Sequence, residues 1–289
     1  SWNDYRLSQL SPRAFSIRKR THDDRPWIGT IEGNQSDGTA FLGDVSGGLS
    51  VCLEDFWESY PTTLEVTDAC KKTAHLTVWL WSPESEPMDL RHYDHVAHDL
   101  NASYEDVQPG MSTPYGIGRT HVLQLKAESG YKGKENFEKT ALNLASSPQI
   151  LPAPEYLHQV RAFGVWSLPD SSNSFRADIE NKLNQYIDYY KTSVKQNGWY
   201  GFWNYGDFMH AYDPIRHEWR YDIGGVAWDN TELGTDMWLW YSFLRSGRSD
   251  IWTLAKAMAR HTCEVDVYHI GDYAGLGSRH NVSHRGSGA

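Results

Sequence analysis

One stretch, from Trp199 to Glu232, constrains what this chain can fold into more than any other. It holds four Trp and four Tyr among histidines, arginines and carboxylates, follows neither a helical nor a strand period, and is interrupted by Gly and Pro. An irregular segment of roughly thirty residues is unusual in a compact domain and is more often functional than not. Aromatic faces beside charged and amide groups suit a sugar-binding cleft. The alternative is that the rings are core, although each buried charge in a core needs a partner.

Bulk composition narrows the classes of partner. The chain has 289 residues, enough for one large domain or two of ordinary size, and a formal net charge of −10 from 37 acidic and 27 basic residues. Nucleic acid is not expected as a partner, because no basic excess exists to neutralise phosphates. An acidic sugar is compatible with this charge, because one carboxylate needs only a local Arg or His. No run of about eighteen apolar residues occurs, so the chain is not expected to span a membrane.

Neither end of the chain looks like a natural terminus. It begins with Ser1-Trp2, which is neither an initiator Met nor a signal peptide, so we expect a mature or truncated portion of a longer protein. Three N-x-S/T sequons, at Asn34, Asn101 and Asn281, would be glycosylation acceptors in a secretory pathway. Together with the polar composition they favour a secreted, extracellular protein.

The three cysteines leave at least one thiol unpaired. Cys52 and Cys70 lie in neighbouring strand-like segments and are candidates for a disulfide. Cys263 falls in a helical pattern and is expected to be a buried thiol.

The first 127 residues carry the pattern of an antiparallel sheet or sandwich. Apolar and polar residues alternate, as in half-buried strands, at 14–19, 48–57, 73–81 and 121–127. Clusters of Gly and Asp at 34–38 and 43–48 predict turns, and Tyr60-Pro61 is expected to mark a strand exit.

A second polar and aromatic stretch runs from residue 84 to residue 118 and is rich in histidine. His92, His95 and His98, spaced by three, could line one face of a helix as metal ligands. The simpler interpretation is a solvated loop, which we prefer because no accompanying carboxylate geometry is recognisable. No metal ligand set is therefore predicted here.

Beyond Pro154 the hydrophobic period becomes helical. Apolar residues recur every three or four positions from Ile179 to Val194 with a stop at Asn197-Gly198, from Leu233 to Leu244 with a stop at Gly247, and from Ile251 to Met258 after a cap at Ser249-Asp250. Helices alternating with long aromatic loops predict an α/α array whose loops gather at one end of a toroid and build a cleft. A four-helix bundle is the alternative, but bundle loops are short.

The predicted fold class is therefore α+β in two regions. We expect a β-sandwich-like domain at 1–127, a linker at 128–155 with a short helix around 135–144, and an α/α toroid portion at 156–289 that carries the cleft.

A second cluster of reactive residues follows the third helical segment. Glycines at 271, 275 and 277 shape a loop that presents Arg279, His280, Asn281 and His284. A capped turn with solvated histidines is the alternative to a functional loop.

Together the two clusters supply what a lyase for acidic polysaccharides needs. The reaction removes the proton on C5 of a uronic acid and expels the oxygen on C4, so the uronate must be neutralised and a base and an acid must be present. The predicted catalytic residues are Tyr205, His210, Arg220, Arg279 and His280. The predicted substrate-binding residues are Trp199, Trp203, Asn204, Arg216, His217, Trp219, Asn281 and His284. In this hypothesis Tyr205 is the acid, His210 or His280 is the base, and an Arg with an Asn neutralises the uronate.

Two rival functions remain open. A glycoside hydrolase on the same toroid needs two carboxylates flanking the bond, and the available ones are Asp207, Asp213, Asp222, Asp229 and Glu232. A carbohydrate-binding module explains the aromatics but not the clustered His and Arg. No cofactor is predicted for the lyase, but a dependence on calcium would indicate Asp207, Asp213 or Asp229 as metal ligands.

Several long segments resemble the exo-acting rhamnogalacturonan lyases of polysaccharide lyase family twenty-six and related secreted proteins. They are WYGFWNYGDFMHAYD, RHEWRYDIGGVAWDNTELGTDMWLWYSFLRSGRSDI, RHTCEVDVYHIGDYAGLGSRHNVSH, FWESYP and STPYGIGRTH. The resemblance covers most of the chain and implies a β-domain, an α/α toroid with a cleft at its mouth, and β-elimination at galacturonic acid in rhamnogalacturonan I, the branched region of pectin. Members of that family are longer, so the toroid is expected to be incomplete here and a C-terminal β-domain to be missing.

Overall fold

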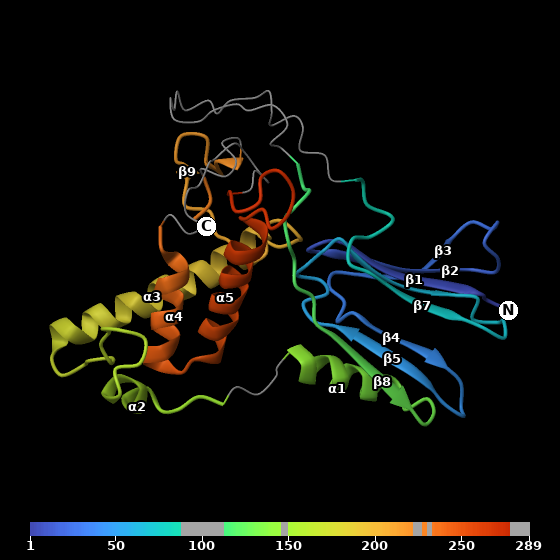
Figure 1. Ribbon diagram of the computed structural model, residues 1–289, viewed down its shortest axis with the longest axis horizontal. Coiled ribbons are helices and arrows are strands. Elements are labelled where there is room, and N and C mark those ends of the chain that lie inside the picture. Colours follow the sequence, from blue (N-terminus) through green and yellow to red (C-terminus); the bar gives the residue numbers. More distant parts are fainter. Residues whose placement is uncertain (88–112, 146–149, 222–226, 230–232, 278–289) are drawn as a thin grey trace. The chain divides into compact units, whose positions relative to one another are not determined.

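The computed structural model describes residues 1–87, 113–145, 150–221, 227–229 and 233–277 (Figure 1). The chain divides into two compact units, and each is described by itself. The first comprises Ser1–Pro87, His121–Pro148 and Tyr200–Phe202, and the second Met88–Thr120, Gln149–Trp199 and Trp203–Ala289. Among the described residues, no helix is both long enough and apolar enough to cross a membrane.

The first unit is a sandwich of two antiparallel sheets. One sheet has the order β3-β2-β1-β6-β7 and is formed by β1 (Asp4–Ser11), β2 (Ala14–Arg20), β3 (Ile28–Gly33), β6 (Thr62–Thr67) and β7 (His75–Trp79). The other has the order β4-β5-β8 and is formed by β4 (Thr39–Gly43), β5 (Gly48–Leu53) and β8 (Leu123–Glu128). Val51, Leu53, Phe56 and Leu64 form a buried core to which both sheets contribute. The predicted sandwich-like fold is therefore confirmed.

All four strands predicted from alternation are present, as β2, β5, β7 and β8. The strands β1, β3, β4 and β6 were not predicted, and β1 shows why. Its buried side chains include Ser8 and Gln9, which are polar, so no hydrophobic alternation marks the strand. The Ser8 hydroxyl accepts a hydrogen bond from Thr63 Oγ1 at 3.0 Å, and Gln9 Nε2 donates to the Asn34 carbonyl at 2.9 Å.

The expectation that Tyr60-Pro61 marks a strand exit is wrong. This cis peptide directly precedes β6, so it marks a strand entry. Proline is tolerated at the start of a strand because it cannot donate to the ladder.

The short helix predicted within the linker is confirmed as α1 (Lys134–Ala145). It packs against β4 and β5, so residues as far as 148 belong with the first unit. The predicted boundaries at 127 and 155 themselves stay a prediction.

The second unit is helical, with α2 (Pro154–Gln159), α3 (Ser174–Asn197), α4 (Thr235–Ser246) and α5 (Ser249–Arg260), the last extended by a π-turn at His261–Val265. The predicted stop of α3 is confirmed, because Gly198 adopts the left-handed conformation and its N–H donates to the Val194 carbonyl. α4 and α5 pack against each other on either side of a short link (Figure 1).

The predicted cap of α5 is wrong in detail. Arg248 occupies the N-cap position and no side chain caps the helix. Asp250, in the first turn, is instead held by Arg248 Nη2 at 2.8 Å and by Lys191 Nζ at 2.5 Å, and the Arg248 hydrogen bond is the largest cause that lowers the pKa of this carboxyl. The ion pair between Lys191 and Asp250 therefore joins α3 to α5.

The cysteine predictions are also corrected. All three thiols are free, with Cys52 buried on β5 and Cys70 exposed in the turn after β6. Cys263 is exposed, because the π-turn after α5 directs it away from the core.

Candidate functional site

The aromatic stretch has short pieces of regular structure that its sequence did not reveal. β9 (Tyr212–Asp213) and β10 (Glu218–Trp219) form a small antiparallel hairpin (Figure 1). Met209 pairs with Trp228 in an isolated bridge. These elements fold residues 207–213 and 227–229 back onto each other within the second unit.

Trp199 belongs to the core of this unit and does not offer a face to a sugar, which corrects the prediction. It is 2% exposed, and the rings of Trp219 and Trp228 pack edge-on at centroid distances of 4.9 and 6.0 Å. Its indole N–H donates to the Tyr221 hydroxyl at 2.8 Å. Trp203 and Trp219 are half-buried, and their role in substrate binding stays a prediction.

Arg216 and His217 lie in the β9–β10 hairpin. Arg216 Nε contacts Asp213 Oδ2 at 2.7 Å, and its Nη1 contacts Glu218 Oε1 at 3.0 Å. The backbone hydrogen bond from Arg216 is the main cause that lowers the pKa of Asp213 to about 2. His217 is exposed in the left-handed conformation, with φ of +56°. The charge of Arg216 is thus already matched by carboxylates of the hairpin.

A buried ionic cluster lies at the C-terminal end of α5, and the sequence did not predict it. His261 is fully buried, with Nε2 at 3.1 Å from Asp266 Oδ1 and 3.4 Å from Asp207 Oδ2. Burial opposes the charged imidazole, but Asp266 and then Asp207 outweigh it and raise the pKa of His261 to about 10. The cluster therefore joins the loop at Asp207 to α5.

Another buried carboxylate, Asp229, interacts with Asp207. Its Oδ2 accepts hydrogen bonds from Thr235 Oγ1 at 2.9 Å and from Tyr190 Oη at 3.0 Å. Its Oδ1 is buried without a hydrogen-bond partner among the residues that the structure describes. Burial is the largest influence on the pKa of Asp229 and raises it, and the hydrogen bonds from Thr235 and Tyr190 oppose this. The charges of Asp207, which raises the pKa, and of His210, which lowers it, contribute less. The buried Asp229 therefore has the buried Asp207 and the exposed His210 as its charged neighbours.

Two predicted catalytic side chains are accessible on this loop. His210 is exposed, its backbone N–H donates to the Ala227 carbonyl at 2.8 Å, and it interacts electrostatically with Asp229. Tyr205 is half-buried, and its carbonyl accepts a hydrogen bond from Arg119 Nη2 at 3.0 Å. Arg119 is a functional candidate that the sequence did not single out, although it lies in a segment that carries the family resemblance.

Two further predicted residues have described positions. Arg220 is half-buried and joined to the loop through its backbone N–H, which donates to the Ala211 carbonyl at 3.0 Å. Asn204 is half-buried, and its carbonyl accepts from the Asp207 N–H at 3.0 Å. Several named residues lie outside the described part of the chain: His92, His95, His98, Asp222, Glu232, Arg279, His280, Asn281 and His284.

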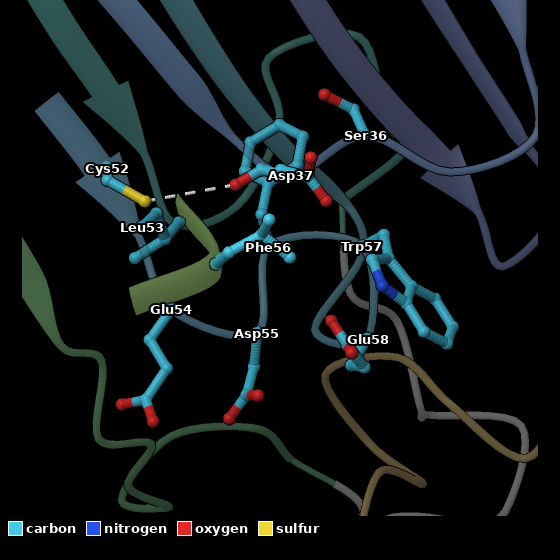
Figure 2. Close-up of a pocket in the computed structure, with 10 residues that line it drawn as sticks. Ser36, Asp37, Cys52, Leu53, Glu54, Asp55, Phe56, Trp57 and Glu58 are labelled. Carbon is cyan, nitrogen blue, oxygen red and sulfur yellow. Dashed lines mark hydrogen bonds between the residues drawn. The ribbon is translucent and has the colours of Figure 1, made fainter. Parts of the chain in front are cut away.

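The first unit holds a separate acidic pocket (Figure 2). Its lining includes the carboxyl groups of Asp37, Glu54, Asp55 and Glu58, with the Trp57 indole beside Glu58. Burial, and then the charge of Asp55, raise the pKa of Glu58 to about 8. A carboxyl group with such a pKa keeps its proton at neutral pH and can donate a hydrogen bond.

The beginning of the aromatic stretch docks beside this pocket. The N–H of Gly201 donates to the Glu58 carbonyl at 2.6 Å, and the N–H of Phe202 donates to the Tyr60 carbonyl at 2.7 Å. The rings of Tyr200 and Trp57 pack at a centroid distance of 4.6 Å. Two segments that carry the family resemblance therefore meet in the first unit.

A second pocket, of about 560 Å³, lies among α2, α4 and α5 in the helical unit. Its lining is almost entirely apolar and includes Trp240, Trp252, Phe243 and Leu244. It lacks the charged groups that a uronate needs, so we do not assign the substrate to it.

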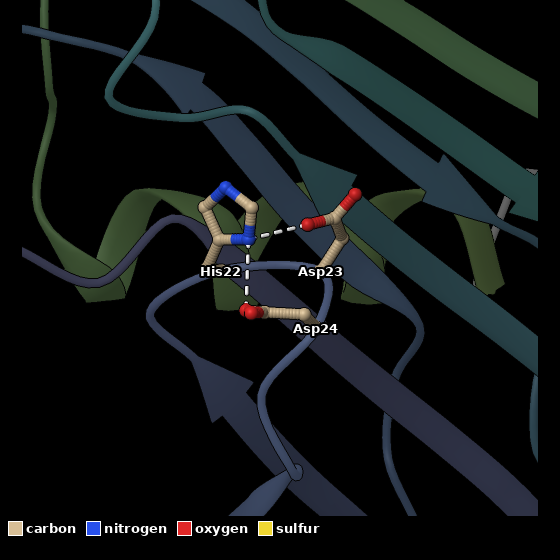
Figure 3. A group of neighbouring side chains, drawn as sticks. All are labelled: His22, Asp23 and Asp24. Atoms are coloured by element: carbon tan, nitrogen blue, oxygen red, sulfur yellow. Dashed lines mark hydrogen bonds and ion pairs between the residues drawn. The ribbon is translucent and has the colours of Figure 1, made fainter.

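One group of three potential metal ligands occurs among the described residues, formed by His22, Asp23 and Asp24 (Figure 3). All three are exposed in the turn between β2 and β3, and His22 Nδ1 contacts both carboxylates. The group shares no residue with the predicted calcium ligands.

Comparison with known proteins accounts for nearly the whole chain. The family model described as the PcRGLX-like protein central beta sandwich domain matches residues 1–142, and that of the PcRGLX-like protein C-terminal alpha/alpha toroid domain matches residues 147–289. A Bacillus subtilis (strain 168) protein, described as uncharacterized protein YetA, is 44% identical over 287 residues. That alignment covers 99% of this chain but 33% of the relative, so the chain spans about a third of the relative's length.

Proposed function

Because the chain belongs to the PcRGLX-like family, which is related to rhamnogalacturonan lyases, we propose that it is part of a secreted polysaccharide lyase. Its substrate is rhamnogalacturonan I or an oligosaccharide of it, cleaved next to galacturonic acid by β-elimination. The family assignment and the accessible His and Tyr on a supported loop are the grounds for this activity.

The reaction assigns a role to each reactive side chain. His210, as the neutral imidazole, takes the proton from C5 of the uronate, and the electron pair forms the C4–C5 double bond as the C4–O bond breaks. Tyr205 gives its phenolic proton to the departing oxygen. Arg220 with Asn204 neutralises the uronate carboxylate. Arg279, His280, Asn281 and His284 keep the roles proposed from the sequence, and Trp203 and Trp219 stack on sugar rings.

One observation carries the proposal: His210 is exposed on a backbone segment that pairs with the segment of the buried Asp229, because the His210 N–H donates to the Ala227 carbonyl at 2.8 Å and the Asp229 N–H donates to the Phe208 carbonyl at 2.7 Å. A catalytic base commonly has a third group behind it that orients it. Asp229 is held in turn by Tyr190 and Thr235, so its position is fixed independently of substrate.

Of the carboxylates predicted for a hydrolase, the three that the structure describes fit that reaction less well. A glycoside hydrolase needs two carboxyl groups that face the scissile bond from an open cleft. Asp207 and Asp229 are 2% and 1% exposed, and Asp213 accepts backbone hydrogen bonds within its turn. Each of these carboxylates is therefore committed to the protein's own structure.

The test is the ultraviolet absorbance of unsaturated uronate during incubation with rhamnogalacturonan I. We expect the absorbance to rise, and His210→Asn and Tyr205→Phe each to slow the rise by about 100-fold or more, the contribution of a general acid or base. His75→Asn, at an exposed histidine on β7 in the first unit, is the matched control and should leave the rate unchanged. New reducing ends without absorbance would refute the lyase and favour the hydrolase.

A further inference from the structure

Arg119 and Tyr205 form a fixed pair within the second unit. Arg119 Nη2 donates to the Tyr205 carbonyl at 3.0 Å, and the guanidinium carbon lies 5.9 Å from the centroid of the Tyr205 ring. At this distance the cation is attracted by the negative face of the ring. One guanidinium therefore bonds the backbone of the proposed acid and lies within cation–π range of its phenol ring.

The π-turn that follows α5 binds both sequence neighbours of Arg119. The N–H of Gly118 donates to the Glu264 carbonyl at 2.9 Å, and the N–H of Thr120 donates to Glu264 Oε2 at 2.7 Å. Glu264 lies in the π-turn that follows α5. Glu264 thus binds the residue before Arg119 and the residue after it, so the backbone of Arg119 is held in place.

The same end of α5 holds the residues that follow Tyr205. A Cβ on Gly206 would lie 2.1 Å from the Ala257 carbonyl oxygen, so the loop presses directly on the helix. Asp207 is bound by His261, 3.4 Å away. Arg119 and Tyr205 thus approach each other from two segments that α5 positions independently.

From this geometry we infer that Arg119 is the positioning residue of Tyr205, fixing the phenol and placing a permanent cation beside it. The inference rests on the proposed function. As the phenol gives its proton to the departing oxygen, negative charge develops on Tyr205 Oη, and a cation held nearby stabilises that charge. Arg216 cannot serve in this way, because Asp213 and Glu218 already bind it.

A double-mutant cycle tests the inference. Arg119→Gln should lower kcat about tenfold with little change in KM, a coupling typical of residues in contact, and Arg119→Lys should recover part of the loss. In the Tyr205→Phe background the same Arg119→Gln change should alter kcat by no more than about twofold, which is the scatter of such cycles, because Arg119 then has no phenol to act on. An equal loss in both backgrounds would show that Arg119 supports the fold generally and would overturn the inference.

A second readout does not depend on turnover. In the full chain labelled with 3-fluorotyrosine, the ¹⁹F signal of Tyr205 is identified by its loss in Tyr205→Phe. Arg119→Gln should move the titration midpoint of this signal to higher pH, because the cation that favours phenolate is gone, whereas Arg119→Lys should restore it. Arg176→Gln is the control, since this exposed arginine pairs with Asp170 at the start of α3.

The two readouts separate the two ideas. A shifted Tyr205 signal in a chain without lyase turnover would refute the proposed reaction and leave the Arg119–Tyr205 coupling intact. A Tyr205 signal that Arg119→Gln leaves unchanged would overturn the coupling, whatever the activity.

Discussion

At the scale of single residues, His261 shows how a buried charge can organise a site. A charged imidazole without hydration is costly, and two carboxylates compensate that cost here. Because Asp207 lies on the loop and Asp266 follows the π-turn, one side chain connects both segments to α5. The loop that carries Tyr205 and His210 therefore depends on a residue that need not touch substrate.

His261 predicts a particular dependence of stability on pH. Its folded pKa, about 10, lies above the ordinary value of about 6.5, so its contribution is complete below pH 6.5 and is lost as the pH rises through about 10. In urea denaturation, the free energy of unfolding should therefore fall as the pH rises across this window. His261→Asn should lack this component and be less stable at pH 6 by about 3–5 kcal/mol, because it leaves buried carboxylates uncompensated. Equal slopes in both proteins would contradict the assignment.

Glu58 predicts a second dependence of stability on pH. Whereas the fold keeps the His261 imidazole charged, it keeps this carboxyl group neutral. Its folded pKa of about 8 exceeds the usual value of 4.5, so its contribution is complete below pH 4.5 and is lost as the pH rises through about 8. Glu58→Gln removes the ionisation and should raise Tm at pH 8.5 relative to the native chain, with a much smaller difference at pH 5. Glu32→Gln, an exposed position on β3, serves as the control. A Tm difference independent of pH would contradict the raised pKa of Glu58.

At the scale of elements, the contact between the 204–210 loop and α5 requires a glycine. Gly206 has φ of +109°, and a Cβ there would meet the Ala257 carbonyl. Gly234, at the start of α4, has φ of +66° but open space around it. Both positions have a positive φ, which residues with a Cβ rarely adopt, and they differ in crowding.

This difference gives a matched pair of substitutions. Gly234→Ala should cost about 1–2 kcal/mol for the left-handed backbone alone. Gly206→Ala should cost a further 1–3 kcal/mol or so from overpacking, because α5 or the loop must move. Denaturant unfolding of both variants measures the two costs. Equal values would mean that the loop does not press on α5.

At the scale of the whole molecule, calcium offers a test that substitution does not. The proposed neutralisers of the uronate are Arg and Asn side chains, so turnover should persist after dialysis against a chelator. Loss of turnover, restored by added calcium, would instead indicate a metal that binds the uronate and would redirect attention to Asp207, Asp213 and Asp229. The assay is the ultraviolet absorbance of the product, with the undialysed chain as control.

The sequence by itself determined the features that local rules govern. Alternation predicted β2, β5, β7 and β8, because half-buried strands expose one face and bury the other. Helical periodicity and Gly198 predicted α3 and its end, because glycine readily adopts the left-handed conformation at a helix terminus. The order of a β-domain and a helical toroid followed from these patterns and from the family resemblance.

Only the tertiary structure decided which polar and aromatic residues are buried. Trp199 and Trp203 are four positions apart in one stretch, yet Trp199 is in the core and Trp203 is half-exposed. In the sequence, His261 is an ordinary histidine at the end of a helix. In the structure, Asp207, which is 54 positions earlier in the chain, lies beside it. Burial and charge pairing depend on residues brought together from distant parts of the chain, and local periodicity carries no information about such contacts.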